Sequence, residues 1–238
     1  MKIHPLVSTY VDNAVAQLRR QNLMCFPGGI PHSMQDNTIP EQDGWRGWKC
    51  CPSTVSNDEL NRLEDETSLK FPTLYRDLLS YQHFISLTEV GLSFERHLPG
   101  EWTHKLQSLY FRSWLPERII KIGLLPFGAE TQMDAGPVCF DTRNRQPDGD
   151  CPVVFWDHDN IKTDDEIQIM FSSSAKMFEC LNIVATNDIN FLNHLDEDGE
   201  ETLPQKQLLL TKFLDADPEG AGGPALKYWT SWGVTKQV

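Results

Sequence analysis

Residues 157–159 combine the side chains that metal ions and acid–base catalysts use. The segment CPVVFWDHD runs from apolar residues into Asp157, His158 and Asp159. If the strand continues here, the two carboxylates lie on one face and the imidazole on the other, because side chains alternate along a strand. Binding one ion would need a bend and further ligands, and no H-E-x-x-H or Cys/His pattern accompanies the segment. We therefore expect a polar strand end, with no metal and no cofactor.

The other motifs that could indicate chemistry are incomplete. If Gly199 of NHLDEDGEE is aligned with the glycine of a calcium-binding loop, His194 falls where the first acid belongs and Gln205 where the bidentate Glu belongs. The chain has no G-x-S-x-G. FPGGIP and EGAGGP lack the Lys-Ser or Lys-Thr of a phosphate loop. No local motif predicts catalysis, although catalytic residues can be assembled from distant positions.

Acidic residues are concentrated in one part of the chain. The formal net charge is -13, and residues 124–170 hold ten Asp and Glu against three Lys and Arg. An acidic surface repels phosphate backbones, so we expect no nucleic-acid binding, whereas a basic protein would be attracted. The alternative is that the acidity only keeps the protein soluble.

The composition is that of a folded protein with one sizeable core. Of its 238 residues, 39% are hydrophobic and 10% aromatic. No run approaches the roughly 18 apolar residues of a membrane span, and the first residues lack the order of a secretory signal. We expect a cytoplasmic protein without membrane association. Its six Cys contain no C-x-x-C pair, which indicates reduced, mostly buried thiols.

The first half of the chain reads as helices. Residues 5–23 carry apolar side chains at helical spacing, which predicts a first helix. Residues 25–53 are too rich in Pro, Gly, Asn and Asp for regular structure. Ser56 and Glu59 form a capping box that starts the next helix, and Pro72 lies early in a third.

The second half reads mainly as strands. Residues 90–98 and 106–111 have short aromatic patterns, which we interpret as strands or edge segments. Residues 136–142 and 151–157 are joined by turn-forming residues and predict a hairpin. Within the second of these strands, Val154 and Trp156 share one face and Val153 and Phe155 the other, so the unbroken apolar run predicts burial on both faces. Residues 167–174 predict another strand. A helix follows, then an acidic loop, a further helix and an aromatic tail that packs on the domain.

Five of these segments follow one another in an order that is typical of a known protein family. The first is STVSNDELNRLEDETSLKFPTLYRDLL, and LLPFG, DAGPVCFDT, PVVFWDHD and SSSAKMFECL follow. This order resembles the SUKH superfamily, which includes a fungal cell-wall-synthesis regulator and many bacterial immunity proteins. The similarity covers about residues 45–185, and in the first motif it runs through Leu60, Leu63, Glu64, Phe71-Pro72, Tyr75 and Leu79.

The resemblance implies an α+β fold without catalytic activity. We expect a single domain with a curved mixed or antiparallel sheet flanked by helices, plus helical N- and C-terminal extensions. Residues 1–44 would form an N-terminal helix and loop, residues 45–185 the SUKH-like domain, and residues 186–238 an acidic loop, helix and aromatic tail packed on it.

Resemblance and charge together predict a non-catalytic protein-binding module. The prediction is an immunity protein that binds and neutralises a cognate toxin domain, such as a nuclease. Two alternatives stay open: a regulatory scaffold that binds an endogenous protein, and an enzyme with no recognisable local motif. Five carboxylates around the predicted hairpin are the expected partner contacts, with ordinary solvated surface as the alternative for each: Glu130, Asp134, Asp141, Asp157 and Asp159.

Overall fold

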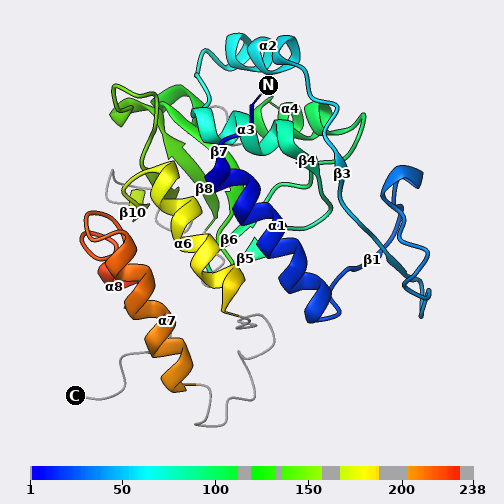
Figure 1. Cartoon of the computed structure of the whole chain (residues 1–238). Coiled ribbons are helices and arrows are strands. Elements are labelled where there is room, and N and C mark those ends of the chain that lie inside the picture. The colour runs from blue at the N-terminus through cyan, green and yellow to red at the C-terminus, as the bar shows by residue number, and fades with distance from the viewer. Residues whose placement is uncertain (1, 112–118, 132–135, 157–166, 188–202, 231–238) are drawn as a thin grey trace.

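A curled, six-stranded antiparallel sheet lies at the centre of the fold (Figure 1). The computed structural model describes residues 2–111, 119–131, 136–156, 167–187 and 203–230. The strand order is β10-β9-β8-β7-β6-β5. The strands are β5 (Thr88–Glu89), β6 (Leu92–Phe94), β7 (Leu124–Ala129), β8 (Pro137–Asp141), β9 (Val153–Trp156) and β10 (Ile167–Phe171). The fold is therefore α+β with an antiparallel sheet, as predicted.

Helices α1, α3 and α6 cover one face of this sheet, and α7 lies beside α6 (Figure 1). The helices are α1 (Pro5–Arg20), α2 (Asn57–Thr67), α3 (Thr73–Tyr81), α4 (Trp102–Phe111), α6 (Ser174–Thr186), α7 (Leu203–Ala216) and α8 (Leu226–Thr230). Among the residues that the structure describes, none of these helices combines the length and the apolar character needed to cross a membrane.

The segment predicted to be irregular contains several short elements. Strands β1 (Cys25–Pro27) and β2 (Trp45–Gly47) pair antiparallel, and β3 (Cys51–Pro52) pairs with β4 (Gln82–His83). The 3-10 helix η1 (His32–Met34) also lies in this segment, and further along the described residues are the 3-10 helices η2 (Ile120–Ile122) and η3 (Thr142–Asn144).

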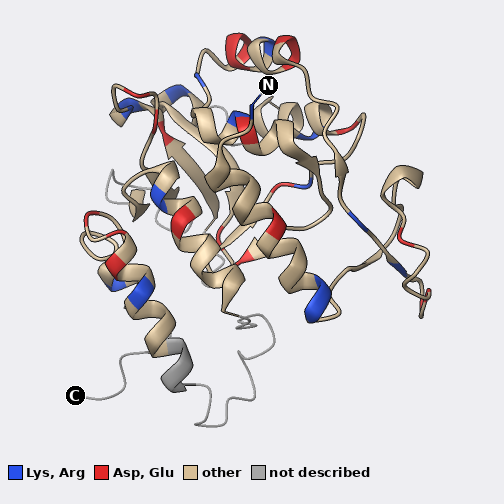
Figure 2. Ribbon diagram, viewed as in Figure 1, with Lys and Arg blue, Asp and Glu red and all other residues tan. Residues whose placement is uncertain are grey.

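The start of α2 confirms the predicted capping box. The Ser56 hydroxyl accepts a hydrogen bond from the Glu59 N–H at 3.2 Å, and the Glu59 carboxylate accepts one from the Ser56 N–H at 2.9 Å. These reciprocal bonds satisfy two N–H groups that the first helical turn leaves without partners. The helix is strongly acidic, and Figure 2 shows Asp and Glu at both of its ends.

The hairpin β8–β9 is also confirmed, with Val138 opposite Phe155 and Phe140 opposite Val153. Val153 and Phe155 belong to the main core, whereas Val154 and Trp156 belong to a second buried cluster on the other face of the sheet. Burial on both faces explains the unbroken apolar run.

The prediction of a strand over residues 106–111 is wrong, because these residues belong to α4. Trp102, Leu106 and Tyr110 recur every four residues and are all buried, which is the pattern of one helix face. Aromatic and β-favouring side chains suggested a strand, but packing against the core decides the structure. Residues 90–98 do contain a strand, β6.

The two chain ends contribute to the same core as the sheet. Val7 and Tyr10 of α1 and Trp229 of α8 are fully buried in the main cluster. The Trp229 indole N–H donates to the Met170 carbonyl of β10 at 2.9 Å, so α8 packs against the sheet. The division of the chain at residues 44/45 and 185/186 stays a prediction.

Candidate functional site

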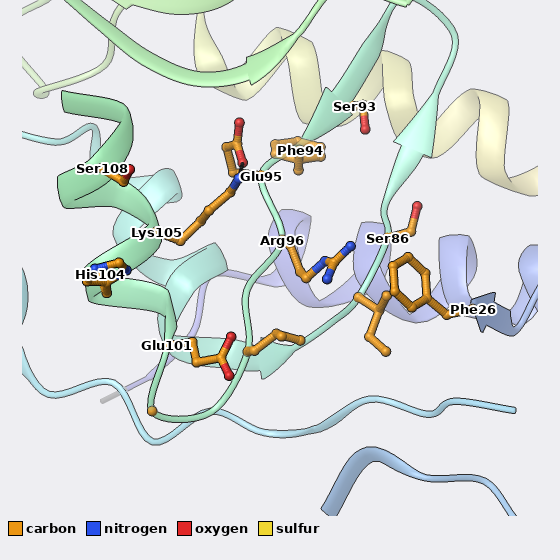
Figure 3. A pocket seen from close by; sticks show the side chains of 13 residues that line it. Phe26, Ser86, Ser93, Phe94, Glu95, Arg96, Glu101, His104, Lys105 and Ser108 are labelled. Atoms are coloured by element: carbon orange, nitrogen blue, oxygen red, sulfur yellow. Dashed lines mark ion pairs between the residues drawn. The ribbon is translucent and has the colours of Figure 1, made fainter. Parts of the chain in front are cut away.

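A groove of about 890 Å³ opens between α4 and the chain from Ile85 to Leu98 (Figure 3). Phe26 of β1 lies at one end of it. Pockets that bind small molecules fall in the range of about 300–1,000 Å³. The groove is therefore large enough to hold a ligand, and we take it as the candidate functional site.

The α4 wall is polar because the helix is amphipathic. Three polar side chains of α4, together with Glu101 just before it, are spaced three and four residues apart and line the groove: Glu101, His104, Lys105 and Ser108. On the opposite face, the side chains of Trp102 and Leu106 are 2% and 3% exposed. This buried face holds the helix on the core, which fixes the direction of its polar face.

Backbone hydrogen bonds hold the other wall in place. The Phe94 N–H donates to the Leu87 carbonyl at 3.0 Å, and the Glu95 N–H donates to the Phe127 carbonyl at 3.2 Å. Two residues further on, His97 and Phe84 exchange N–H and carbonyl bonds at 3.1 and 3.0 Å. These backbone bonds fix the position of this wall relative to the sheet.

The charged side chains of the groove differ in how they are neutralised. Lys105 pairs with Glu95 across the groove at 3.3 Å. The Arg96 guanidinium lies 4.2 Å from the centre of the Phe26 ring, a cation–π contact. Among the described residues, neither Arg96 nor Glu101 has a partner of opposite charge.

Hydroxyl groups line the wall near β5 and β6. The Ser86 and Thr88 hydroxyls are 3.1 Å apart, and those of Thr88 and Ser93 are 2.9 Å apart. Ser86 and Ser93 also line the groove. Such a chain offers both donors and acceptors to a polar ligand.

Two of the predicted partner contacts are buried inside the fold and lie at opposite ends of the β7–β8 pair. Glu130 follows β7, is 5% exposed and accepts a hydrogen bond from the Tyr228 hydroxyl at 2.6 Å. Asp141 ends β8, is 3% exposed and accepts hydrogen bonds from Arg143 and Asn144. Burial would raise the pKa of Asp141, but the hydrogen bonds outweigh it and hold this pKa below its ordinary value. Both carboxylates thus have structural partners.

The remaining predicted contacts, Asp134, Asp157 and Asp159, lie outside the described residues, as does His158. Direct contact of any of the five carboxylates with a partner stays a prediction. In the part of the chain that the structure describes, no group of three or more His, Cys, Asp or Glu side chains could hold a metal ion.

All six cysteines are free thiols. Cys139, Cys151 and Cys180 are buried, and the other three are partly exposed. Burial raises the pKa of Cys151 to about 11 and that of Cys50 to about 12. Since the thiolate is the reactive form, these two thiols are poor nucleophiles at neutral pH.

The residues of the first shared motif stabilise the fold. Leu60, Leu63, Phe71, Tyr75 and Leu79 are all buried in the main core. In the later LLPFG motif, Phe127 stacks on Phe140 with ring centres 3.9 Å apart. Gly128 is required there because a side chain would meet the Ser93 carbonyl oxygen of β6 at 2.4 Å. The motifs therefore describe a core and do not mark the groove.

The chain thus forms a small α+β domain that is built on a curled antiparallel sheet and has a groove beside α4. The model of the SMI1 / KNR4 family (SUKH-1) matches residues 54–180, which is more than half of the chain. The chain therefore belongs to the SMI1 / KNR4 family (SUKH-1), as the resemblance predicted. No curated protein and no solved structure matches it.

The groove was missed from the sequence for a specific reason. The second half of its α4 wall, residues 106–111, was interpreted as a strand, residues 99–105 were given no element, and its other residues come from separate segments, including Phe26. The signal was nevertheless present, because Glu101, His104, Lys105 and Ser108 have the spacing of one helix face.

Proposed function

We propose that the chain is a non-catalytic protein-binding module that acts as an immunity protein, binding a cognate toxin domain and blocking it. Its membership of the SMI1 / KNR4 family (SUKH-1) carries this proposal, because the family includes immunity proteins and regulators. The net charge of -13 further favours a basic partner, such as a nuclease domain.

The proposed mechanism is occlusion of the toxin's active surface. Carboxylates on the acidic protein raise the association rate with a basic partner, and a few well-buried contacts supply most of the retained affinity. Because Glu130 and Asp141 have internal partners, we assign direct contact first to Asp134, Asp157 and Asp159 among the predicted set. Exposed acids of α2, such as Asp58, Asp65 and Glu66, extend the negative field.

The test begins with the proteins encoded next to this one. Each neighbour would be expressed with and without the chain, and growth, co-purification and association rate would be measured. We expect one neighbour to be toxic, to be neutralised by the chain and to co-purify with it. Its association should slow as salt rises, since salt screens charges beyond about 10 Å at 0.1 M.

A regulatory scaffold is the second candidate, because the same family also includes regulators. Under that function no neighbouring protein is toxic, and the specific partner is an endogenous protein whose activity changes when it binds. Elemental analysis of the native protein addresses the third candidate, since a stoichiometric bound metal would point to an enzyme.

A further inference from the structure

We propose that the groove between α4 and residues 85–98 binds an extended segment of the partner protein, with a basic side chain at Glu101 and an acidic side chain at Arg96. This inference rests on the proposed function in requiring a protein partner. Beyond that function, the groove defines where one segment of the partner binds and which charges this segment carries.

The Glu101 carboxylate is the negative charge of the groove that a ligand can neutralise. Glu95 and Lys105 neutralise one another, so a ligand gains little by replacing either. Glu101 is exposed and, within the described ranges, has no hydrogen-bond or ion-pair partner for its carboxylate. It can therefore accept hydrogen bonds from a Lys or Arg side chain.

The Arg96 guanidinium is the positive group of the groove that can bind an acidic side chain of the ligand. Its guanidinium stacks over Phe26, and Figure 3 shows the two side chains directed toward one another. Stacking occupies a face of the guanidinium plane and leaves its edge, where the N–H donors are, free for a carboxylate. The Phe26 contact thus orients the group while its edge donors stay available.

The lining of the groove combines apolar, charged and hydroxyl side chains, and this mixture suits a peptide segment. Phe26, Ile85, Phe94 and Leu98 can contact apolar side chains of the peptide. Ser86, Ser93 and Ser108 stand among the charged groups, and their hydroxyls can donate to carbonyls and accept from N–H groups of a peptide backbone.

Both walls of the groove are held in place by the rest of the fold. The buried face of α4 and the backbone bonds at Phe94, Glu95 and His97 hold both sides of the groove in place. A ligand therefore loses less binding free energy to ordering the protein, and a short segment can bind measurably.

The experiment uses the full chain and a phage-displayed library of short random peptides as the probe. Peptides enriched on the chain would be synthesised and their affinities measured for the wild type, Glu101→Lys and Arg96→Glu. Glu219→Lys and Arg62→Glu are the matched controls, since both residues are exposed and lie outside the groove.

We expect the enriched peptides to share one basic and one acidic residue at a fixed separation. Each groove variant should weaken their binding at least about tenfold, the effect of losing about 1.4 kcal/mol, while the controls change it less than about twofold. A peptide whose basic residue is replaced by Glu should regain affinity for Glu101→Lys. This rescue shows direct contact, because a general loss of folding cannot produce it.

The inference is overturned if no peptide is enriched above an unrelated protein, or if the enriched peptides bind both groove variants as well as the wild type. Its failure is separable from that of the proposed function. If a toxin is neutralised equally by the wild type and both groove variants, the toxin-binding function stands and the groove assignment falls. If the peptides follow the charge rule but no toxin exists, the groove binds a segment of another partner.

Discussion

The carboxylate of Glu64 on α2 and the guanidinium of Arg76 on α3 form an ion pair at 2.6 Å. The Glu64 carboxylate also accepts a hydrogen bond from the Phe71 N–H at 3.1 Å and pairs with Lys70 at 3.2 Å. Its side chain is only 6% exposed. One acidic residue of the family motif thus joins two helices and the turn between them.

Replacing Glu64 with Ala should destabilise the protein by about 3 kcal/mol, because Arg76 and the Phe71 N–H lose a buried charged partner. Urea unfolding would measure the change. Asp65→Ala is the control: Asp65 pairs with the same Lys70 at 3.3 Å, but its side chain is 76% exposed. That variant should lose less than about 0.5 kcal/mol. Equal losses for the two variants would contradict a structural role for Glu64.

Removing the hydroxyl of Tyr228 tests how the C-terminal helix is attached. The Tyr228 hydroxyl donates to buried Glu130 at 2.6 Å, so Tyr228→Phe should cost about 1–3 kcal/mol in free energy of unfolding. In Tyr81→Phe, the lost hydrogen bond to Asp12 is exposed, and the cost should stay below about 0.5 kcal/mol. If Tyr228→Phe is as stable as the wild type, this bond does not hold α8 on the sheet.

Glu89 should make the protein less stable as pH rises. Burial raises its pKa from 4.5 to about 8, so the folded state keeps a proton that the unfolded state releases. The contribution is fully present below pH 4.5 and is lost as pH rises through about 8, at up to about 1.4 kcal/mol per pH unit. Glu89→Gln should therefore gain stability relative to the wild type between pH 5 and 8. Unfolding curves across that range would check it, and the exposed Glu219→Gln should show no such gain.

His97 should make the protein less stable as pH falls. Burial, with a smaller effect from His83, lowers the pKa of His97 from 6.5 to about 3. Its contribution to stability is present above pH 6.5 and is lost as pH falls toward 3, because only the unfolded state then takes up the proton. His97→Gln should flatten the fall in stability below pH 6.5. His32→Gln, which changes an exposed histidine, should leave that slope unchanged.

Some elements could be predicted from short stretches of the sequence alone. The capping box of Ser56 and Glu59 lies within four residues and defines a helix start without help from the rest of the fold. The alternating residues of β9 predicted burial on both faces because strand geometry alone relates Val153 to Val154. Family motifs then supplied the order of the remaining elements.

Features that depend on distant contacts could not be predicted in the same way. Glu130 reads as a surface acid until Tyr228, 98 residues away, is placed against it. The groove joins Phe26 to Arg96, and no local pattern relates the two. In α4, a helix spacing competes with strand-favouring aromatic side chains, and only the packing of Trp102 and Leu106 decides between them.

The packing of α1 against α6 has a consequence for synthesis in the cell. The Asn13 amide donates to the Asn182 side-chain oxygen at 2.8 Å across 169 residues of chain. At about 5–20 residues per second, the ribosome needs roughly 10–30 s to produce the partner helix after α1. During that time the apolar stripe of Val7, Tyr10, Val11 and Ala14 lacks α6, and only earlier segments such as α3 and Phe94 can cover part of it. We therefore expect the apolar face of α1 to stay partly exposed on the nascent chain until translation has passed α6.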